Sequence, residues 1–285
     1  METKTLIEKI LTEYGISNPM QMKLDNILYG EGFVYNEEKL STHQGRMTRD
    51  MESGIGKITV NSDIRETGKK NFVIAHELGH HFLSVGTQKF CRESDISIFK
   101  SGSEDERKAN EFAAELLMPT EWVNKNIHWN GNAINLINQM AKTFNVSFTS
   151  AAIRYSTIGD KPIAVIASKE NRVIWVNANK KMRYKYVKIG SEVHPESSAS
   201  YIFNNGKTCS EIRCIEPEIW FSDDKSYKQD RANFYFYDGE NYDSEYNEEV
   251  PYDVTYEEIL KAGFHEQTIY LKNYGECLTM VWEGE

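Results

Sequence analysis

The 285-residue sequence is poor in cysteine and proline and contains no long apolar run. Its four cysteines, Cys91, Cys209, Cys214 and Cys277, are too few and too irregularly spaced for a disulfide framework or a zinc knuckle, so we expect buried free thiols. With only 6 prolines and a hydrophobic fraction of 40%, the composition excludes general disorder. No stretch approaches the ~18 apolar residues that a membrane-spanning helix needs, so we expect no membrane partner.

Positive charge is also scarce, with 33 basic against 43 acidic side chains and a formal net charge of -10. This balance disfavours the phosphate backbone of a nucleic acid as a partner, except through a local basic patch. The first residues, METKTLIEKILTEYG, place apolar side chains at helical spacing with charges between them. They predict an amphipathic helix in place of a secretory signal, and hence a cytoplasmic protein.

Apolar spacing predicts an α+β protein whose pattern changes near residue 160. Before that point we expect short strands around 33–35 and 56–62, and helices around 20–30, 71–84, 104–118, 132–144 and 148–158. After it come short apolar runs typical of strands, PIAVIAS, RVIWVN, QTIYLK and CLTMVW. We therefore divide the chain into a core over residues 1–125, a helical segment over 126–160 and a smaller α+β domain over 161–285.

Acidic residues are concentrated in the last of these parts. Residues 161–285 contain 15 basic and 22 acidic side chains, against 18 and 21 before them. Most of the acids lie between Glu216 and Glu258, interleaved with tyrosines. We interpret this stretch as a solvated face with ordinary aromatic packing, with a partner surface as the alternative.

The residues that carry chemistry are His76, Glu77 and His80, an HExxH pattern inside a predicted helix. Positions i and i+4 of a helix project from one face, so two imidazoles can reach a single Zn²⁺. Ile74 and Leu78 form a buried stripe on the opposite side. We expect this stripe to anchor the helix and the histidine face to border a cleft.

A catalytic zinc site usually needs a third protein ligand, and no third histidine follows in the extended form of the motif. Helical phase in the 104–118 segment puts Glu106 on the inward side and Glu111 and Glu115 on the outward side. We choose Glu106 as the third ligand, with Asp105 as the alternative. Asn110 follows Glu106 by one turn, where it could orient a ligand or simply pack between helices.

The segment AHELGHHF, followed by ERKANEFAAELLMP and later by LINQMAKTFNVSFTSAAIRYSTIG, resembles the ImmA/IrrE family of bacterial zinc metallopeptidases over roughly residues 20–160. The resemblance implies a zincin-like core, with Zn²⁺ or Mn²⁺ held by His76, His80 and Glu106, and Glu77 as the catalytic base. It also implies a protein substrate, a helix-turn-helix repressor whose cleavage relieves repression of a stress or mobile-element response. Residues 161–285 resemble the GAF-like sensor domains attached to some members.

Several other residues have weaker patterns. His81 directly follows His80 and therefore points away from the helix face that carries the histidine pair. We expect it to pack against neighbouring residues or to contact a ligand residue without binding the metal itself. The strand around Ile58 to Val60 is expected to run along the cleft and to hold an extended substrate by main-chain pairing. The remaining histidines outside the motif have no matching ligand pattern: His43, His128, His194 and His265.

The stretch from Ile134 to Tyr155 could also be a DNA-reading helix-turn-helix, with Asn145 and Val146 in the turn. Only Lys142 and Arg154 are basic there, whereas a DNA reader neutralises several phosphates, so direct nucleic-acid binding is disfavoured. Three functions remain: a regulatory endopeptidase, a non-cleaving metal-containing regulator, and a DNA-binding regulator with a structural metal. Glu77 favours the peptidase, because a structural metal site needs ligands but no base.

Overall fold

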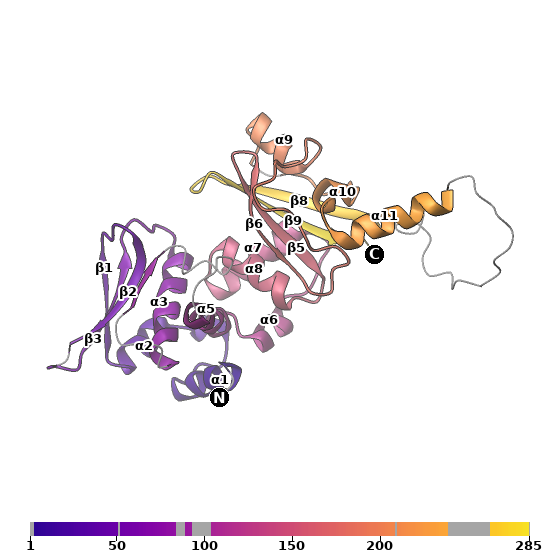
Figure 1. Ribbon diagram of the computed structural model, residues 1–285. Coiled ribbons are helices and arrows are strands. Elements are labelled where there is room, and N and C mark those ends of the chain that lie inside the picture. Colours follow the sequence, from indigo (N-terminus) through magenta and orange to yellow (C-terminus); the bar gives the residue numbers. More distant parts are fainter. Residues whose placement is uncertain are drawn as a thin grey trace. The chain divides into compact units, whose positions relative to one another are not determined.

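The computed structural model of the chain describes residues 3–50, 52–83, 89–92, 104–208, 210–238 and 263–284 (Figure 1). The chain divides into two compact units, the first comprising Met1–Asn130 with Asn135–Gly159 and the second Gly131–Ile134 with Asp160–Glu285. Each unit has its own sheet, so the protein is a mixed α+β structure. In the described part of the chain, no helix combines the length and apolar character that crossing a bilayer would require.

The first unit contains a four-stranded sheet in the order β1-β3-β2-β4. Its strands are β1 (Phe33–Glu38), β2 (His43–Arg49), β3 (Gly56–Asn61) and β4 (Lys89–Arg92). β3 pairs in parallel with β1 and antiparallel with β2, while β2 also pairs with β4. The expectation that the strand around Ile58 to Val60 pairs with a substrate is therefore wrong, because both edges of β3 already bind neighbouring strands.

The helices of the first unit occupy most of the segments that the apolar spacing indicates. They are α1 (Thr3–Glu13), α2 (Leu24–Gly30), α3 (Thr67–Phe82), α5 (Glu104–Leu117), α6 (Thr120–Asn126), α7 (Ala133–Phe144) and α8 (Phe148–Ile158). α3 begins four residues earlier than expected, at Thr67. Met20 lies outside α2, in a short 3-10 turn over Pro19–Gln21, where its side chain is exposed.

The closest helix packing in the first unit joins α3 to α5. Gly79 of α3 faces Ala109 and Phe112 of α5, and a Cβ atom at position 79 would lie 3.1 Å from both the Cα and the carbonyl oxygen of Ala109. Because glycine and alanine meet at this point, the two backbones can approach closely. Leu78, Ala109 and Phe112 are fully buried.

The helix pair α7–α8 is joined by a tight turn in which Asn145 has a positive φ of 51°. The turn rests on the start of α3, where a Cβ at Gly68 would lie 2.3 Å from backbone atoms of Val146 and Ser147. Arg154 of α8 is buried, donates hydrogen bonds to the carbonyl oxygen of Met118 and forms an ion pair with Glu115. This interaction removes one of the two cations that a DNA-reading helix pair would have offered.

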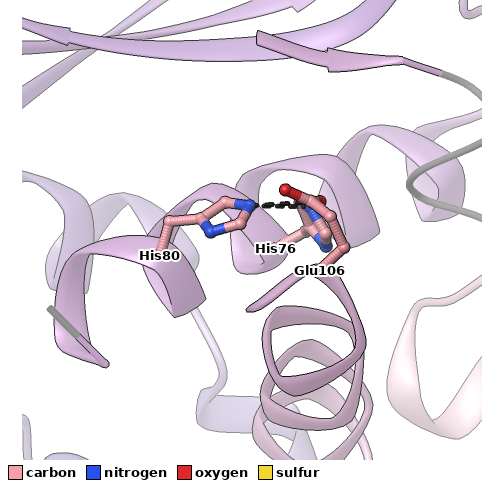
Figure 2. A group of neighbouring side chains, drawn as sticks. All are labelled: His76, His80 and Glu106. Carbon is pink, nitrogen blue, oxygen red and sulfur yellow. Dashed lines mark hydrogen bonds and ion pairs between the residues drawn. The ribbon is translucent and has the colours of Figure 1, made fainter. Parts of the chain in front are cut away.

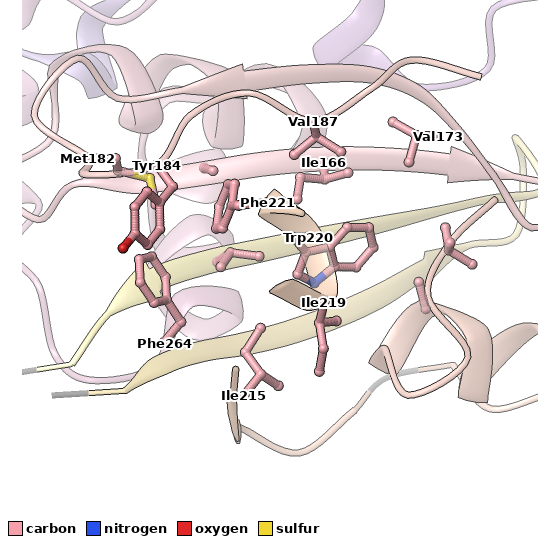
Figure 3. Close-up of a cluster of buried hydrophobic side chains, with 14 of the residues drawn as sticks. Ile166, Val173, Met182, Tyr184, Val187, Ile215, Ile219, Trp220, Phe221 and Phe264 are labelled. Atoms are coloured by element: carbon pink, nitrogen blue, oxygen red, sulfur yellow. The ribbon is translucent and has the colours of Figure 1, made fainter. Parts of the chain in front are cut away.

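The second unit is built on a five-stranded antiparallel sheet in the order β6-β5-β9-β8-β7. Its strands are β5 (Ile163–Lys169), β6 (Arg172–Ala178), β7 (Arg213–Ile215), β8 (Phe264–Leu271) and β9 (Glu276–Glu283). Its helices are α9 (Ser198–Asn205), α10 (Glu218–Phe221) and α11 (Lys225–Asp238). The core includes Tyr184, Trp220, Phe221 and Phe264 (Figure 3).

A fully buried carboxylate, Glu266, links three elements of this unit. One of its oxygens accepts hydrogen bonds from the backbone N–H and the hydroxyl of Ser198, at 2.7 and 2.6 Å, at the start of α9. The other accepts the indole N–H of Trp220 in α10, at 2.8 Å. A carboxylate can remain inside an apolar core only with such donors, so Glu266 ties β8 to both helices.

Two of the expectations for the second unit concern its cysteines and its acidic stretch. Cys277 is buried as expected, but Cys214 is exposed because it lies on the short edge strand β7. Cys209 and residues 239–262, which include the last 20 residues of the acidic, tyrosine-rich stretch, lie outside the described residues.

Replacement of Gly79 by leucine should force α3 and α5 apart. We expect Gly79→Leu to lower the free energy of unfolding of the first unit by ~1–3 kcal/mol, the usual effect of overpacking. Urea unfolding followed by circular dichroism measures the change. The matched control is Glu111→Leu on the exposed side of α5, for which a change within ~0.5 kcal/mol is expected. Equal losses in the two variants would contradict the close helix contact.

Removal of the indole N–H from Trp220 should leave one oxygen of Glu266 without a donor. Trp220→Phe is expected to destabilise the second unit by ~1–3 kcal/mol, the cost of a buried polar group that loses its partner. Thermal unfolding measures this loss. Trp122→Phe, at a partly exposed site in α6, is the control, and a larger effect there than at Trp220 would refute the role assigned to Glu266.

Candidate metal centre

Three side chains from two helices meet inside the first unit. His76 and His80 project from α3 one turn apart, and Glu106 reaches them from the first turn of α5 (Figure 2). The Nε2 atoms of the two histidines lie 3.1 Å apart, and Oε2 of Glu106 lies 3.1 Å from His76 Nε2 and 3.3 Å from His80 Nε2. In the described part of the chain, this is the group of His, Cys, Asp and Glu side chains whose ligand atoms are close enough to share one metal ion.

The spacing of these three atoms fits a tetrahedral metal ion. Nitrogen and carboxylate ligands bind Zn²⁺ at ~2.0–2.2 Å, so two ligand atoms at tetrahedral corners stand about 3.3–3.6 Å apart. The three observed separations are within a few tenths of an ångström of that range. Two imidazoles and one carboxylate are also a donor set found at catalytic zinc sites. The geometry could therefore hold a metal with little movement.

The protonation states of His76 and Glu106 suit metal binding. Burial lowers the pKa of His76, although hydrogen bonding to Glu106 acts in the opposite direction. Burial raises the pKa of Glu106, but hydrogen bonds from His76 and His80 outweigh it and hold that pKa well below its usual range. Since metals bind neutral imidazole and ionised carboxylate, His76 and Glu106 are biased toward the forms that bind.

Glu77 lies on α3 between the two histidines, and its side chain is fully buried. It faces β2, where a Cβ atom at Gly45 would lie 3.0 Å from Glu77 Oε1 and 2.4 Å from Val73 Cγ1. The absence of a side chain at Gly45 thus allows the strand to lie directly over Glu77. Sequence analysis did not identify Gly45, although a lone glycine within a strand can signal such a close approach.

The histidine face is more enclosed than expected. His76, Glu77 and His80 are 0%, 0% and 1% exposed, so they do not line an open cleft as the sequence analysis had suggested. A substrate can reach these side chains only if neighbouring atoms move. Because His76, Glu77 and His80 are buried, bulk water is excluded from them and the electrostatic interactions among their side chains are stronger than at an exposed site.

Two residues close to the ligands in sequence differ in whether they contact the site. Asn110 is buried one turn after Glu106, and its side-chain hydrogen bond to His76 partly opposes the lowering of the His76 pKa by burial. His81 points elsewhere, with its Nε2 atom 2.9 Å from Glu31 and its ring edge against Phe33. Asn110 is thus placed to orient a ligand, whereas His81 packs away from the cluster.

The other acidic candidates of α5 lie outside the cluster of ligand atoms. Asp105, the alternative third ligand, is half-buried at the start of the helix. Glu111 faces outward as expected, whereas the same expectation for Glu115 is wrong, because Arg154 and Thr120 cover its carboxylate. Burial raises the pKa of Glu115, but the charge of Arg154 and hydrogen bonds hold it below its usual value.

Comparison with known proteins agrees with this arrangement. The family model of the IrrE N-terminal-like domain, peptidase M78, matches residues 31–156, which include both helices of the cluster. Among solved structures, the chain is similar to a Mycobacterium tuberculosis transcriptional regulator, with a TM-score of 0.55 and 12% identity over 99% of this chain and 76% of that one. That identity shows a likeness of fold alone. No curated protein matches the sequence. Residues 31–156 therefore match the IrrE N-terminal-like domain of the peptidase M78 family, the metallopeptidase family that the two motifs of the chain resemble.

Proposed function

We propose that the protein is a zinc-dependent endopeptidase that cleaves a specific regulatory protein. The observation that carries this proposal is the meeting of His76, His80 and Glu106 at tetrahedral ligand spacing. Glu77 is buried on the same helix, and the match to the M78 peptidase family points to the same chemistry. Mn²⁺ is the alternative ion, because the donor set does not distinguish the two metals.

In this mechanism, His76, His80 and Glu106 hold the ion and Glu77 moves the proton. A bound Zn²⁺ would supply Lewis acidity and lower the pKa of water at the site to about 7. Glu77 accepts a proton as the water oxygen bonds to the carbon of the scissile carbonyl. When the C–N bond breaks, Glu77 returns that proton to the leaving amine nitrogen. Asn110 acts as a positioning residue for His76.

The substrate that fits best is a helix-turn-helix transcriptional repressor in the cytoplasm, cleaved to relieve repression of a stress or mobile-element response. The family match supports a regulatory protein as substrate. The structural neighbour is described as a transcriptional regulator, which is consistent with a role in transcriptional control. The burial of the catalytic side chains favours selective cleavage, since a chain that cannot displace the covering atoms is not cut.

For the chain beyond the peptidase core we propose two supporting parts. Residues 126–160 brace the core through the turn against α3 and through Arg154, and do not read DNA. Residues 161–285 act as a GAF-like sensor or regulatory domain. The support for this role is that the ligands and base proposed for catalysis all lie before residue 161.

We expect the purified chain to bind one Zn²⁺ or Mn²⁺ and His80→Ala to lose it, because two ligands rarely hold a catalytic metal. Inductively coupled plasma mass spectrometry after dialysis gives the metal content per chain. The matched control is His128→Ala, an exposed histidine outside the cluster, which should retain the wild-type content. Equal metal content in His80→Ala and the wild type would disprove the site.

Glu77→Gln should keep the metal and lose cleavage, because the amide has the size of the carboxylate but cannot accept the proton. The loss expected for removal of a general base is ~10²–10⁴-fold in rate. Gel analysis of the helix-turn-helix repressor encoded nearest to this gene, incubated with the metal-loaded protein, measures cleavage. Glu111→Gln, on the exposed side of α5, is the control.

The outcomes of this second experiment separate the remaining functions. Undiminished cleavage by Glu77→Gln would remove Glu77 from the mechanism. Failure of the wild-type protein to cleave the repressor while it binds both metal and repressor would favour the non-cleaving regulator, since that function needs the ligands but not the base.

A further inference from the structure

The second unit contains a stretch whose charge is opposite to that of the rest of the unit. Residues 171–191 contain six basic side chains and no acidic one, within a 161–285 segment that has 22 acidic and 15 basic side chains. Five of the six lie between Lys180 and Lys188. We call residues 180–190, which connect β6 to the segment before α9, the basic ribbon.

The ribbon is a folded surface with a buried side and an exposed side. Met182, Tyr184 and Val187 point inward and belong to the core of the second unit (Figure 3). Lys181, Arg183 and Lys185 are exposed and alternate with Met182 and Tyr184 along the chain. The alternation of buried and exposed residues through 181–185 is that of an extended chain, so outward side chains recur about every 7 Å.

Several carboxylates of the unit hold the backbone of the ribbon in place. Oδ2 of Asp224 accepts the backbone N–H groups of Lys185 and Tyr186, at 2.9 and 2.8 Å. Glu283 accepts the backbone N–H of Arg183 at 2.7 Å, and Asp230 accepts the hydroxyl of Tyr184 at 2.7 Å. A surface that is fixed before it binds loses less conformational entropy when a partner arrives.

The lysines of the ribbon keep their charge available. Arg183 forms an ion pair with Asp230, so its guanidinium is already in use. Within the described part of the chain, by contrast, no ion pair involves Lys181, Lys185 or Lys188. These three exposed ammonium groups form a row of positive charge in an acidic protein.

Two large apolar side chains are exposed within the same row. Tyr186 is 55% exposed and Ile189 is 63% exposed, next to Lys185 and Lys188 respectively. Exposed aromatic and aliphatic groups beside unpaired charges are typical of interaction surfaces, where the apolar contacts supply affinity and the charges supply orientation.

We propose that the basic ribbon is a docking site for an extended acidic peptide segment of a partner protein. The peptide would carry carboxylates that reach Lys181, Lys185 and Lys188, and apolar side chains against Tyr186 and Ile189. This inference does not depend on the peptidase activity. It concerns a surface of the second unit that shares no residue with the metal centre.

The extent of the surface favours a peptide over larger polyanions. Residues 181–188 span only ~23 Å when extended. A nucleic-acid strand or an anionic bilayer would continue past the ribbon, in a unit whose remaining charge is strongly negative, and would be repelled there. A short acidic peptide places its carboxylates on the ribbon alone.

The test is fluorescence anisotropy with the full-length protein and a labelled peptide of about nine residues, in which glutamate alternates with tyrosine or leucine. We expect saturable binding that weakens ~10-fold between 50 and 300 mM salt, as for a contact between exposed charges. The triple variant Lys181→Glu, Lys185→Glu, Lys188→Glu should bind at least ~10-fold more weakly. The control, Lys9→Glu, Lys23→Glu, Lys125→Glu, makes the same change in net charge on exposed lysines of the first unit and should bind like the wild type.

Further probes make each outcome decisive. The matched peptide with glutamine for glutamate should not bind, and the variant with arginine at positions 181, 185 and 188 should restore binding, which excludes a general loss of folding. Tyr186→Ala should weaken binding without changing its salt dependence. Equal binding of the glutamine peptide would overturn the proposal. So would tighter ribbon-dependent binding of a 20-nucleotide single strand or of phosphatidylserine vesicles.

Discussion

The proposed chemistry depends on how closely α3 and α5 can approach. Two of the three ligand atoms lie on α3, and the third lies on a helix that reaches them only because Gly79 meets Ala109 without an intervening side chain. Contacts between packed helices are short-ranged. If α3 and α5 lay farther apart by the width of one methylene group, Glu106 would be out of reach of both histidines. A bound metal would in turn hold the two helices together, since binding energy at a site formed only in the folded state adds to stability.

Much of this arrangement was predictable from the sequence, because it depends on local periodicity. The i, i+4 spacing places His76 and His80 on one face whatever the tertiary structure, and the phase of α5 turns Glu106 inward. The contacts of Gly45, Glu115 and Glu266 were not predictable, because each involves an element far away in sequence. Periodicity indicates which face of a helix is buried but not which strand or side chain will cover it. The sequence therefore predicted an outward position for Glu115 and main-chain pairing of the strand around Ile58 with a substrate.

Buried carboxylates of this protein act in two different ways. In the first unit, Glu106 is ionised beside two imidazoles, a state suited to an incoming cation. In the second, Asp224 and Glu266 accept hydrogen bonds from backbone and side-chain donors and act as fixed structural links. Glu106 can therefore still bind a metal ion, whereas the hydrogen-bonding capacity of Asp224 and Glu266 is satisfied within the fold. The distinction explains why acidity alone is a poor guide to function in this chain.

The buried pair of Arg154 and Glu115 has a consequence for related sequences. The two residues are 39 positions apart, yet loss of either would leave an unpaired charge inside the unit, at a cost of ~3–5 kcal/mol. Replacement of both by apolar residues of similar volume could be nearly neutral. Positions 115 and 154 should therefore covary during evolution. In relatives where only the arginine persists, its guanidinium could still donate hydrogen bonds to the backbone after α5, as Arg154 does to the carbonyl oxygen of Met118, but it would have no carboxylate to balance its charge.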